Sequence, residues 1–363
     1  MNKLRQEINI IGIGCVFNRG RGVDKLRSAL VNGWVAPIRK ELSSESTKPR
    51  PSYPVSQETI IDKQVLSSVS RADRLTKMAI LAAYDALRDG EVVMDKARNS
   101  LGIVLATSKG PHIKYFNSHD DILNHGEVNI SPLKFTHATK DGGASCIAAV
   151  LNSYGPTITV NQFEFPFQEA LSVAKSWLME NRCEYVLAGS VDECGDAMNH
   201  IYSKRWRLAA DGRIKPFQFS AEPESVPGEG SIFFLLNNEK YGEKYCEISN
   251  VWFKDDLKDS RSDMCIIDAN GMADDESCYK EAIKDNITVS AYSPLFGSMI
   301  TGSAFNCAAG ALMLKNQIKY ASPVKDNPHK ISIILKNQRA NLKEINCIGC
   351  YSSRRKSVVK LKI

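Results

Sequence analysis

Residues 155–171 read Gly-Pro-Thr-Ile-Thr-Val-Asn-Gln-Phe-Glu-Phe-Pro-Phe-Gln-Glu-Ala-Leu. The β-branched residues at 157–161 predict a strand, and the pattern from Phe167 onward predicts a helix. The short connection between them brings Glu164 to the start of the helix, where the helix dipole stabilises negative charge. A strand that passes through a tight turn into a helix is the building unit of α/β proteins.

The same alternation extends over the whole chain. Strands are predicted at residues 8–16, 102–107, 157–161, 185–190, 231–237, 245–253, 264–268, 331–335, 345–350 and 358–363. Helices are predicted at residues 23–31, 71–87, 146–151, 167–180, 192–206, 275–284 and 308–320. This order of elements predicts an α/β fold.

Three segments shape the predicted organisation. The helix at 71–87 is apolar except for one polar stripe, so we expect it to lie between two sheets. Residues 40–59 are rich in Ser, Pro, Glu and Lys and predict a surface loop. The composition changes again at residues 237–240, which predicts an N-terminal half at 1–240 and a shorter C-terminal half at 241–363.

Composition limits the classes of function. The 363 residues are 43% hydrophobic and 24% charged, as in a globular protein. The sequence contains no run of eighteen apolar residues, which is about the length needed to span a membrane. The N-terminus has no apolar signal core, and the ten cysteines are scattered, so we expect a reduced, cytoplasmic protein.

The charge balance favours acidic partners only mildly. The chain has 47 basic and 41 acidic residues, a net charge of +6, which suits an acidic protein partner or carrier. The basic runs at 204–207 and 354–356 are interpreted as solvated surface. No nucleic-acid-binding motif accompanies them.

Three further segments follow the strand-to-helix turn along the chain. They are Lys215-Pro-Phe-Gln with Val226-Pro-Gly-Glu-Gly-Ser, then Ile267-Asp-Ala-Asn-Gly-Met-Ala-Asp, and the Gly- and Ala-rich stretch at 296–311. In this order, and with the opening Ile8-Asn-Ile-Ile-Gly-Ile-Gly and the closing Asn346-Cys-Ile-Gly-Cys-Tyr, they resemble the β-ketoacyl synthase family. The resemblance covers nearly the whole chain. It implies the thiolase fold, in which two related α/β halves form a layered αβαβα core.

The chain departs from this family at each catalytic position. The nucleophilic Cys of the family matches Glu164, its first His matches Asn270, and its Lys and second His match Met299 and Ala304 by alignment on residues 308–311. A carboxylate would form a mixed anhydride, which water destroys, whereas condensation needs a stable thioester. Asn270 could supply one hydrogen-bond donor to a developing enolate and Ala304 none. We therefore expect no condensation by this chain.

Other side chains are candidate substitutes for the missing catalytic groups. Cys146 lies on a helix that looks buried, which favours a structural thiol. Cys347 and Cys350 have metal-ligand spacing without a second pair, which also favours a structural role. Glu164 could act as a general base, but a charge at a helix start or an interface contact is the preferred interpretation. None of the six histidines (His112, His119, His125, His137, His200 and His329) lies in a motif.

Members of the family without the catalytic set resemble the chain length factor. That resemblance implies a heterodimer with an active ketosynthase subunit, contact with an acyl carrier protein directly or through that partner, and no cofactor or metal. It also implies pairing through the strand at 157–161. Phe163, Phe165 and Phe167 are the candidates to plug the site or to cap the partner's acyl tunnel. The alternatives are a malonyl-carrier decarboxylase or priming subunit and a non-catalytic homodimer. The product class stays open among fatty acids, polyenes, including aryl polyenes, and polyketides.

Overall fold

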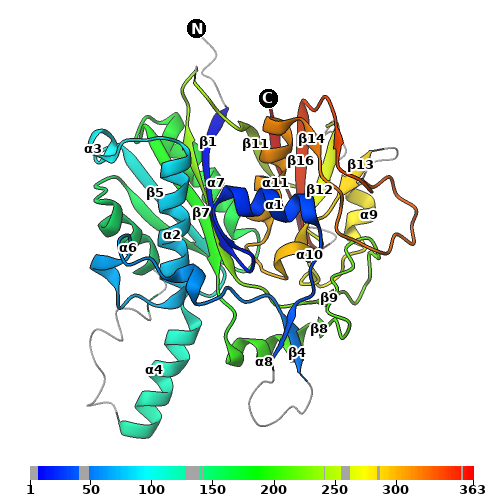
Figure 1. Ribbon diagram of the computed structural model, residues 1–363, viewed down its shortest axis with the longest axis horizontal. Helices are drawn as coiled ribbons and strands as arrows, with labels where there is room; N and C mark the ends of the chain where they lie inside the picture. Colours follow the sequence, from blue (N-terminus) through cyan, green and yellow to red (C-terminus); the bar gives the residue numbers. More distant parts are fainter. Residues whose placement is uncertain are drawn as a thin grey trace.

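The fold is known from a computed structural model, which describes residues 7–40, 49–126, 139, 142–240, 242–254, 262–283, 287–352 and 355–363 (Figure 1). Its strands are β1 (Ile8–Phe17), β2 (Gly20–Arg21), β3 (Ile38–Lys40), β4 (Arg50–Ser52), β5 (Leu101–Thr107), β6 (Thr157–Asn161), β7 (Tyr185–Asp192), β8 (Arg207–Leu208), β9 (Glu224–Ser225), β10 (Gly230–Asn237), β11 (Cys246–Lys254), β12 (Met264–Ile267), β13 (Thr288–Ser290), β14 (Ile318–Lys319), β15 (Gln338–Arg339), β16 (Glu344–Ser352) and β17 (Arg355–Lys362).

The α-helices are α1 (Val23–Asn32), α2 (Arg74–Asp89), α3 (Met94–Ala97), α4 (His112–His125), α6 (Gly142–Leu151), α7 (Pro166–Met179), α8 (Asp196–Arg205), α9 (Cys278–Ala282), α10 (Ser293–Phe296) and α11 (Ser303–Asn316). Two 3-10 turns precede α2, at Glu58–Ile60 and Ser67–Val69. No helix in the described ranges is long and apolar enough to cross a membrane.

One long sheet runs through the molecule and contains a repeated pattern. Its order is β13-β12-β16-β17-β11-β1-β10-β7-β5-β6, with β2 beside β1. In the first half, β1, β10 and β7 are antiparallel and β7, β5 and β6 are parallel. In the second half, β11, β17 and β16 are antiparallel and β16, β12 and β13 are parallel. The antiparallel pair β1–β11 joins them. The predicted pair of related α/β halves is confirmed, and a division after residue 240 stays a prediction.

Alternating side chains sort the strands into layers. On β10, Phe233 and Leu235 pack against α2, whereas Ile232 and Phe234 face the opposite side, where α7 and α11 lie. On the strands of the second half, one face also meets α7 and α11 and the other meets α9. Since successive side chains of a strand point to opposite faces, the period of two produces helices on both sides of each half. The layers therefore follow in this order: α2 with α6, the first half of the sheet, α7 with α11, the second half of the sheet, and α9.

The helix expected between the two sheets lies elsewhere. α2 covers the outer face of the first half, and its apolar partners come from β1, β5, β7, β10 and α6. It is buried because the sheet covers one side and α6 with residues 55–66 cover the other. The strand comes unusually close, since a Cβ on Gly14 would lie 2.1 Å from the Ala82 carbonyl oxygen. The helices between the sheets are α7 and α11.

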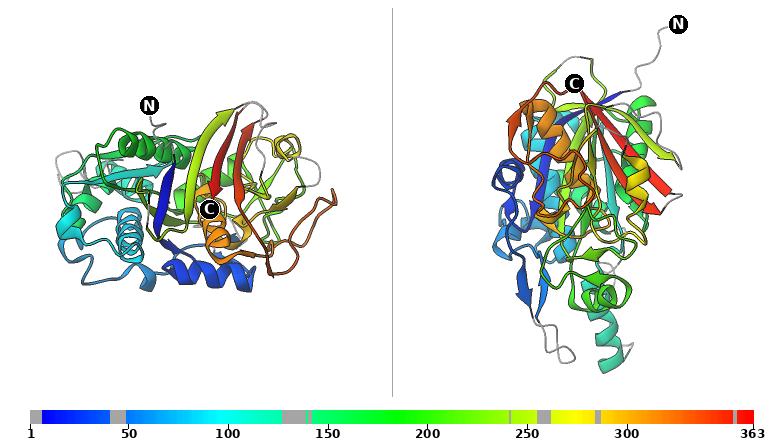
Figure 2. Two further views of the ribbon diagram at one scale, coloured as in Figure 1. Left: turned by 90° about the horizontal axis from the view of Figure 1, so that it is seen from above. Right: turned by 90° about the vertical axis from the view of Figure 1, so that its right-hand side faces the viewer.

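Three other expectations change, and two elements were not predicted. Residues 331–335 form no strand, although Ile333 makes an isolated bridge to Val289 of β13, an edge strand that the sequence did not indicate. The loop predicted at 40–59 contributes to a hairpin, β3–β4, and residues 41–48 lie outside the described residues. The helix expected at 192–206 begins as α8 after β7 has run on to Asp192. Helix α4 was not predicted, because it buries only His112 and has no apolar stripe; it projects from the body (Figure 2).

A buried carboxylate ties α2 to the sheet. Glu229 is 1% exposed, and its oxygens accept hydrogen bonds from Val55 N at 2.7 Å, Cys194 N at 3.1 Å and the Arg74 guanidinium. Burying a charge is costly unless it is paired and hydrogen-bonded, and here every element around it contributes a donor.

Glu229→Ala should therefore lower the free energy of unfolding by about 3–5 kcal/mol, since Arg74 is left without its partner in a half-buried place. The matched control is Glu222→Ala, which breaks an ion pair with Arg207 whose side chains are 69% and 64% exposed, and should cost no more than about 1 kcal/mol. Urea denaturation measures both. Similar small losses for the two variants would contradict this account of Glu229.

Candidate functional site

The site begins at the turn between β6 and α7. Phe165 has left-handed backbone angles, φ 52° and ψ 40°, and caps the helix, and Pro166 occupies the first helical position. Positive φ is unusual for a bulky residue and marks a tightly constrained turn. Glu164 precedes it, as the sequence predicted, so the connection sets the directions of three consecutive side chains, from Phe163 to Phe165.

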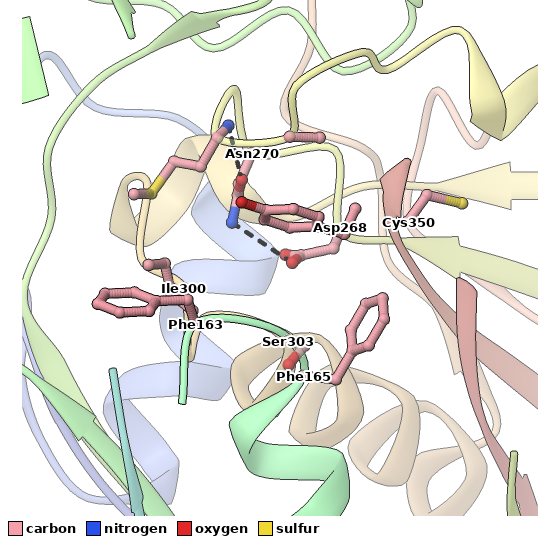
Figure 3. A pocket seen from close by; sticks show the side chains of 10 residues that line it. Phe163, Phe165, Asp268, Asn270, Ile300, Ser303 and Cys350 are labelled. Carbon is pink, nitrogen blue, oxygen red and sulfur yellow. Dashed lines mark hydrogen bonds between the residues drawn. The ribbon is translucent and has the colours of Figure 1, made fainter. Parts of the chain in front are cut away.

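A pocket opens beside this turn (Figure 3). It is lined by Phe163, Phe165, Asp268, Asn270, Met272, Ala273, Ile300, Ser303, Cys350 and Tyr351. The lining residues come from the β6–α7 turn, the end of β12, the segment before α11 and the end of β16. Strand ends and helix starts from both halves therefore converge on one cavity.

Of the four predicted catalytic positions, only Asn270 contributes its side chain to this lining. Met299 is 2% exposed and Ala304 is fully buried, and both belong to the apolar core between the sheets. The carboxylate of Glu164 is turned to an ion pair with Arg355 of β17. Neighbours of the predicted residues line the pocket in their place, namely Phe163, Phe165, Ile300 and Ser303.

Asn270 does not have the free donor that the sequence suggested. Its Nδ2 donates to the Met299 carbonyl at 2.8 Å and to Asp268 Oδ2 at 3.3 Å, and its Oδ1 accepts from Met272 N at 3.0 Å. An amide nitrogen has two hydrogens, so both are used. This side chain closes the loop after β12 and cannot at the same time donate to a developing enolate.

Two carboxyls lie at this loop, of which Glu276 is buried and Asp268 is half-buried at the pocket wall. Burial raises the pKa of Asp268 to about 7, against the opposing effect of a hydrogen bond from Asn306 Nδ2 at 3.1 Å. Burial raises the pKa of Glu276 to about 8, although its Oε1 accepts from Gly271 N at 2.8 Å. Perturbed carboxyls in a pocket can mark acid–base chemistry. Here Asp268 is held by two asparagine amides, so its contacts are those of a structural group.

The cysteines offer no substitute nucleophile. Cys347 and Cys350 are three residues apart on β16 and point to opposite faces, Cys347 into the core with α7 and α11 and Cys350 toward α9 and the pocket. Burial raises the pKa of the Cys350 thiol well above its ordinary value, and burial also raises that of Cys146, which packs beside α2. A raised pKa keeps a thiol protonated and unreactive. All ten cysteines are free.

The histidines lie away from the pocket. No histidine is among the described lining residues, and His137 is outside the described part of the chain. The buried one is His112 at the start of α4, where burial lowers its pKa to about 4. Its Nδ1 lies 3.7 Å from Oε1 of Glu193, whose pKa burial raises to about 8. No group of three or more His, Cys, Asp or Glu in the described ranges could hold a metal ion.

The two basic runs of the sequence meet near the pocket. Arg205 Nη2 donates to the hydroxyl of Tyr351 at 3.3 Å, and Arg355 pairs with Glu164. Residue 354 lies outside the described residues. A third cation was not recognised from sequence: Lys109 Nζ lies 5.7 Å from the centre of the Phe163 ring, and burial lowers its pKa to about 8. The only sequence signal for Lys109 is its place just after β5, at the same sheet edge.

Sequence reasoning also missed Asp268, Ser303, Cys350 and Tyr351 as lining residues. Asp268 lies two positions before Asn270 at the end of a strand, which is a usable signal, because the carboxyl ends of parallel strands meet at one edge of a sheet. The other three depend on how the second half folds back on the first.

The comparisons with known proteins agree with this geometry. The family model described as "Beta-ketoacyl synthase, N-terminal domain" matches residues 5–240. The ishigamide ketosynthase/chain length factor superposes with a TM-score of 0.80 at 13% identity, covering 99% of both chains. A ketosynthase bound to a hexaketide in complex with its type II PKS acyl-carrier protein gives a TM-score of 0.79 at 14% identity, covering 98% of this chain and 99% of that one. A β-ketoacyl synthase from Burkholderia phymatum STM815 gives the same values. No curated protein sequence matches. The thiolase-like fold is therefore confirmed.

The raised pKa of Asp268 predicts a pH dependence of stability. The unfolded carboxyl has a pKa of about 4, so between about pH 4 and pH 7 the folded protein holds a proton that the unfolded chain has lost. The free energy of unfolding should fall across this window as pH rises, and Asp268→Asn should remove that share of the slope. Urea unfolding at several pH values measures it, with the exposed Asp24→Asn as control. Parallel curves for wild type and Asp268→Asn would contradict the prediction.

Proposed function

The chain belongs to the β-ketoacyl synthase family, and on that premise we propose that it is a non-catalytic subunit of the chain length factor type. The observation that supports the proposal is that the residues at the predicted catalytic positions are engaged in structural contacts. Glu164 is ion-paired, Asn270 has both amide hydrogens engaged, and Met299 and Ala304 are core residues. Such a site can neither hold a thioester nor stabilise an enolate.

An active ketosynthase would then supply the chemistry. We propose that this chain pairs with such a subunit, whose nucleophilic Cys carries the growing chain, and that an acyl carrier protein delivers the units directly or through the partner. The complex would work in the cytoplasm in fatty acid, polyene or polyketide synthesis. Support comes from the family and from the likeness to a structure named as a ketosynthase/chain length factor, which at 13% identity is a likeness of fold.

Strand β6 is the proposed pairing surface. It ends the long sheet and, among the described strands, pairs only with β5. Thr157 and Ile158 are exposed, Ile158 by 43%. An exposed apolar edge strand is an aggregation hazard in a monomer, and a partner strand removes the hazard.

Co-expression with an active ketosynthase subunit should give a heterodimer that elongates carrier-bound acyl groups. Ile158→Lys should weaken the pairing strongly, because it places a charge at the strand edge. Leu335→Lys changes a residue that is 76% exposed in the second half and should leave pairing intact. Light scattering after size-exclusion chromatography measures the mass. A stable monomer that does not bind the ketosynthase would contradict the proposal. A homodimer that does not bind it would favour the alternative function, a non-catalytic homodimer.

The chain alone should show no condensation, and Glu164→Cys should not restore it. A thiol beside Arg355 would ionise readily, so this variant should accept an acyl group from a thioester. It should still fail to condense with malonyl carrier protein, because the Asn270 donors are engaged and Ala304 has none. Mass spectrometry of protein and carrier separates the two steps. Condensation by wild type that is lost in Glu164→Ala would overturn the proposal.

Of the three phenylalanines, we propose Phe163 as the residue that faces the partner's tunnel. Phe167 is fully buried with its ring centre 5.6 Å from that of Phe234, so it is a core residue. Phe163 and Phe165 both line the chain's own pocket, but the Phe165 ring packs toward that of Phe253, which suits a plug. Phe163 is 56% exposed and comes two residues after β6 ends.

Phe163→Ala in the complex should shift products toward longer chains with turnover within a few-fold of wild type. The ring would no longer close the tunnel, and each added methylene that becomes buried there contributes roughly 0.8 kcal/mol. Leu335→Ala is the control for removal of an exposed apolar side chain. The measurement is mass spectrometry of carrier-bound products. An unchanged length distribution from a folded complex would rule out Phe163 as the cap.

A further inference from the structure

Helix α4 is attached to the body of the molecule mainly through its first turn. Of its fourteen residues, only His112 is buried, and the helix projects from the body (Figure 2). One turn further along, Phe116 packs against a small apolar cluster. A segment with so few buried contacts can open locally while the rest of the protein stays folded.

The cluster under Phe116 is also part of the pocket wall. Its buried members are Met198 of α8 and Met272 after β12, and the residues packed against them include Trp206 and Ile300. Met272 and Ile300 line the pocket. A movement of α4 would therefore remove packing from one wall of the pocket.

Two hydrogen bonds hold the first turn of α4 on the segment that follows β7. Ile113 N donates to Glu193 Oε1 at 2.8 Å. Gly195 N donates to His112 Nε2 at 3.3 Å, and this bond needs a lone pair that a protonated imidazole ring does not have. The fit is close, since a Cβ on Gly195 would lie 2.6 Å from Ile113 Cγ1. The attachment of the helix therefore depends on the protonation of its two titratable contacts.

Glu193 fits this place only while it is uncharged. It is 3% exposed, and its Oε2 has no hydrogen-bond partner among the described residues, so a carboxylate here would be a poorly compensated buried charge. The other charged and titratable groups around the pair are Lys109 after β5, Asp73 and Arg74 at the start of α2, Asp192 at the end of β7, Cys194 after it and Glu229 before β10. Of the two cations, Arg74 already pairs with Glu229. The three carboxyls of the set oppose a further negative charge.

We propose that α4 is a cover over this wall of the pocket and that it opens when Glu193 ionises. The closed state disfavours the charged form of both groups, because burial raises the pKa of Glu193 from 4.5 to about 8 and lowers that of His112 from 6.5 to about 4. Between about pH 4.5 and 6.5, opening takes a proton from Glu193 and gives one to His112, so its equilibrium is nearly independent of pH. Between about pH 6.5 and 8, opening releases a proton and becomes about tenfold more favourable. The cover does not depend on the proposed pairing with a ketosynthase.

Hydrogen–deuterium exchange of the full chain, read by peptide mass spectrometry from about pH 5 to about pH 8.5, tests the cover. After correction for the intrinsic exchange rate, the α4 amides should open about tenfold more at pH 8 than at pH 6.5. The amides of β10 should stay protected throughout, which separates local opening from unfolding. Glu193→Gln keeps an acceptor for Ile113 N and cannot ionise, so the rise should disappear. The matched control is Asp120→Asn, an exposed carboxyl on α4 itself, which should behave as wild type does.

Thiol labelling at one fixed pH gives a second readout. Gly195→Ala should push the first turn away from the body, and Phe116→Ala should remove the packing on the cluster and leave the titratable pair intact. In both variants iodoacetamide should label Cys350, which lines the pocket, several-fold faster than in wild type, while Cys246 in the sheet core stays slow. An equal rise of α4 exchange with pH in wild type and Glu193→Gln would overturn the proposal. Faster α4 exchange with unchanged labelling of Cys350 would also overturn it, because α4 would then cover nothing.

Discussion

The buried carboxylate of Asp192 fixes the loops of the two halves of the site relative to one another. It lies at the end of β7, where Oδ1 accepts from the main-chain nitrogen of Ser108 at 3.0 Å and from its hydroxyl at 2.7 Å. Oδ2 accepts from Thr301 N at 3.1 Å, in the segment before α11. One side chain thus joins the ends of β5 and β7 to the second half. Since a buried charge is tolerated only with such donors, the position of each loop depends on the others.

The motifs that carry the family resemblance also hold the segment before α11 in place. Gly228 lies so close to the second half that a Cβ there would be 2.3 Å from the Phe296 carbonyl oxygen. Ser298 N donates to the Val226 carbonyl at 2.7 Å, and Gly228 N donates to the Ser298 carbonyl at 3.1 Å. The adjoining Glu229 fixes α2. The frame of the pocket is therefore built from main-chain contacts and buried charges that do not require a nucleophile.

This separation explains what the sequence could and could not predict. Strand and helix periodicity was enough for the α/β class, because it depends on local pattern, whereas the two related halves were implied by the family resemblance. The predicted position of α2 was wrong, because a helix that is apolar on most sides can lie either between two sheets or between a sheet and a covering helix. The engagement of Asn270 was missed because residue type gives the number of donors and not their partners. Cys350 was missed as a lining residue because its face of β16 depends on register.

The two ends of the sheet differ, and the open end leads into the site. At one end, the side of β13 is met by a bridge between Val289 and Ile333. At the other, β6 presents exposed side chains and, in the described ranges, no further strand. The open edge is also the strand that leads into the turn carrying Phe163, Glu164 and Phe165. In the proposed heterodimer, a partner strand laid along β6 would hold this turn at the interface, so the chain could shape the neighbouring site through the rigidity of one strand and one turn.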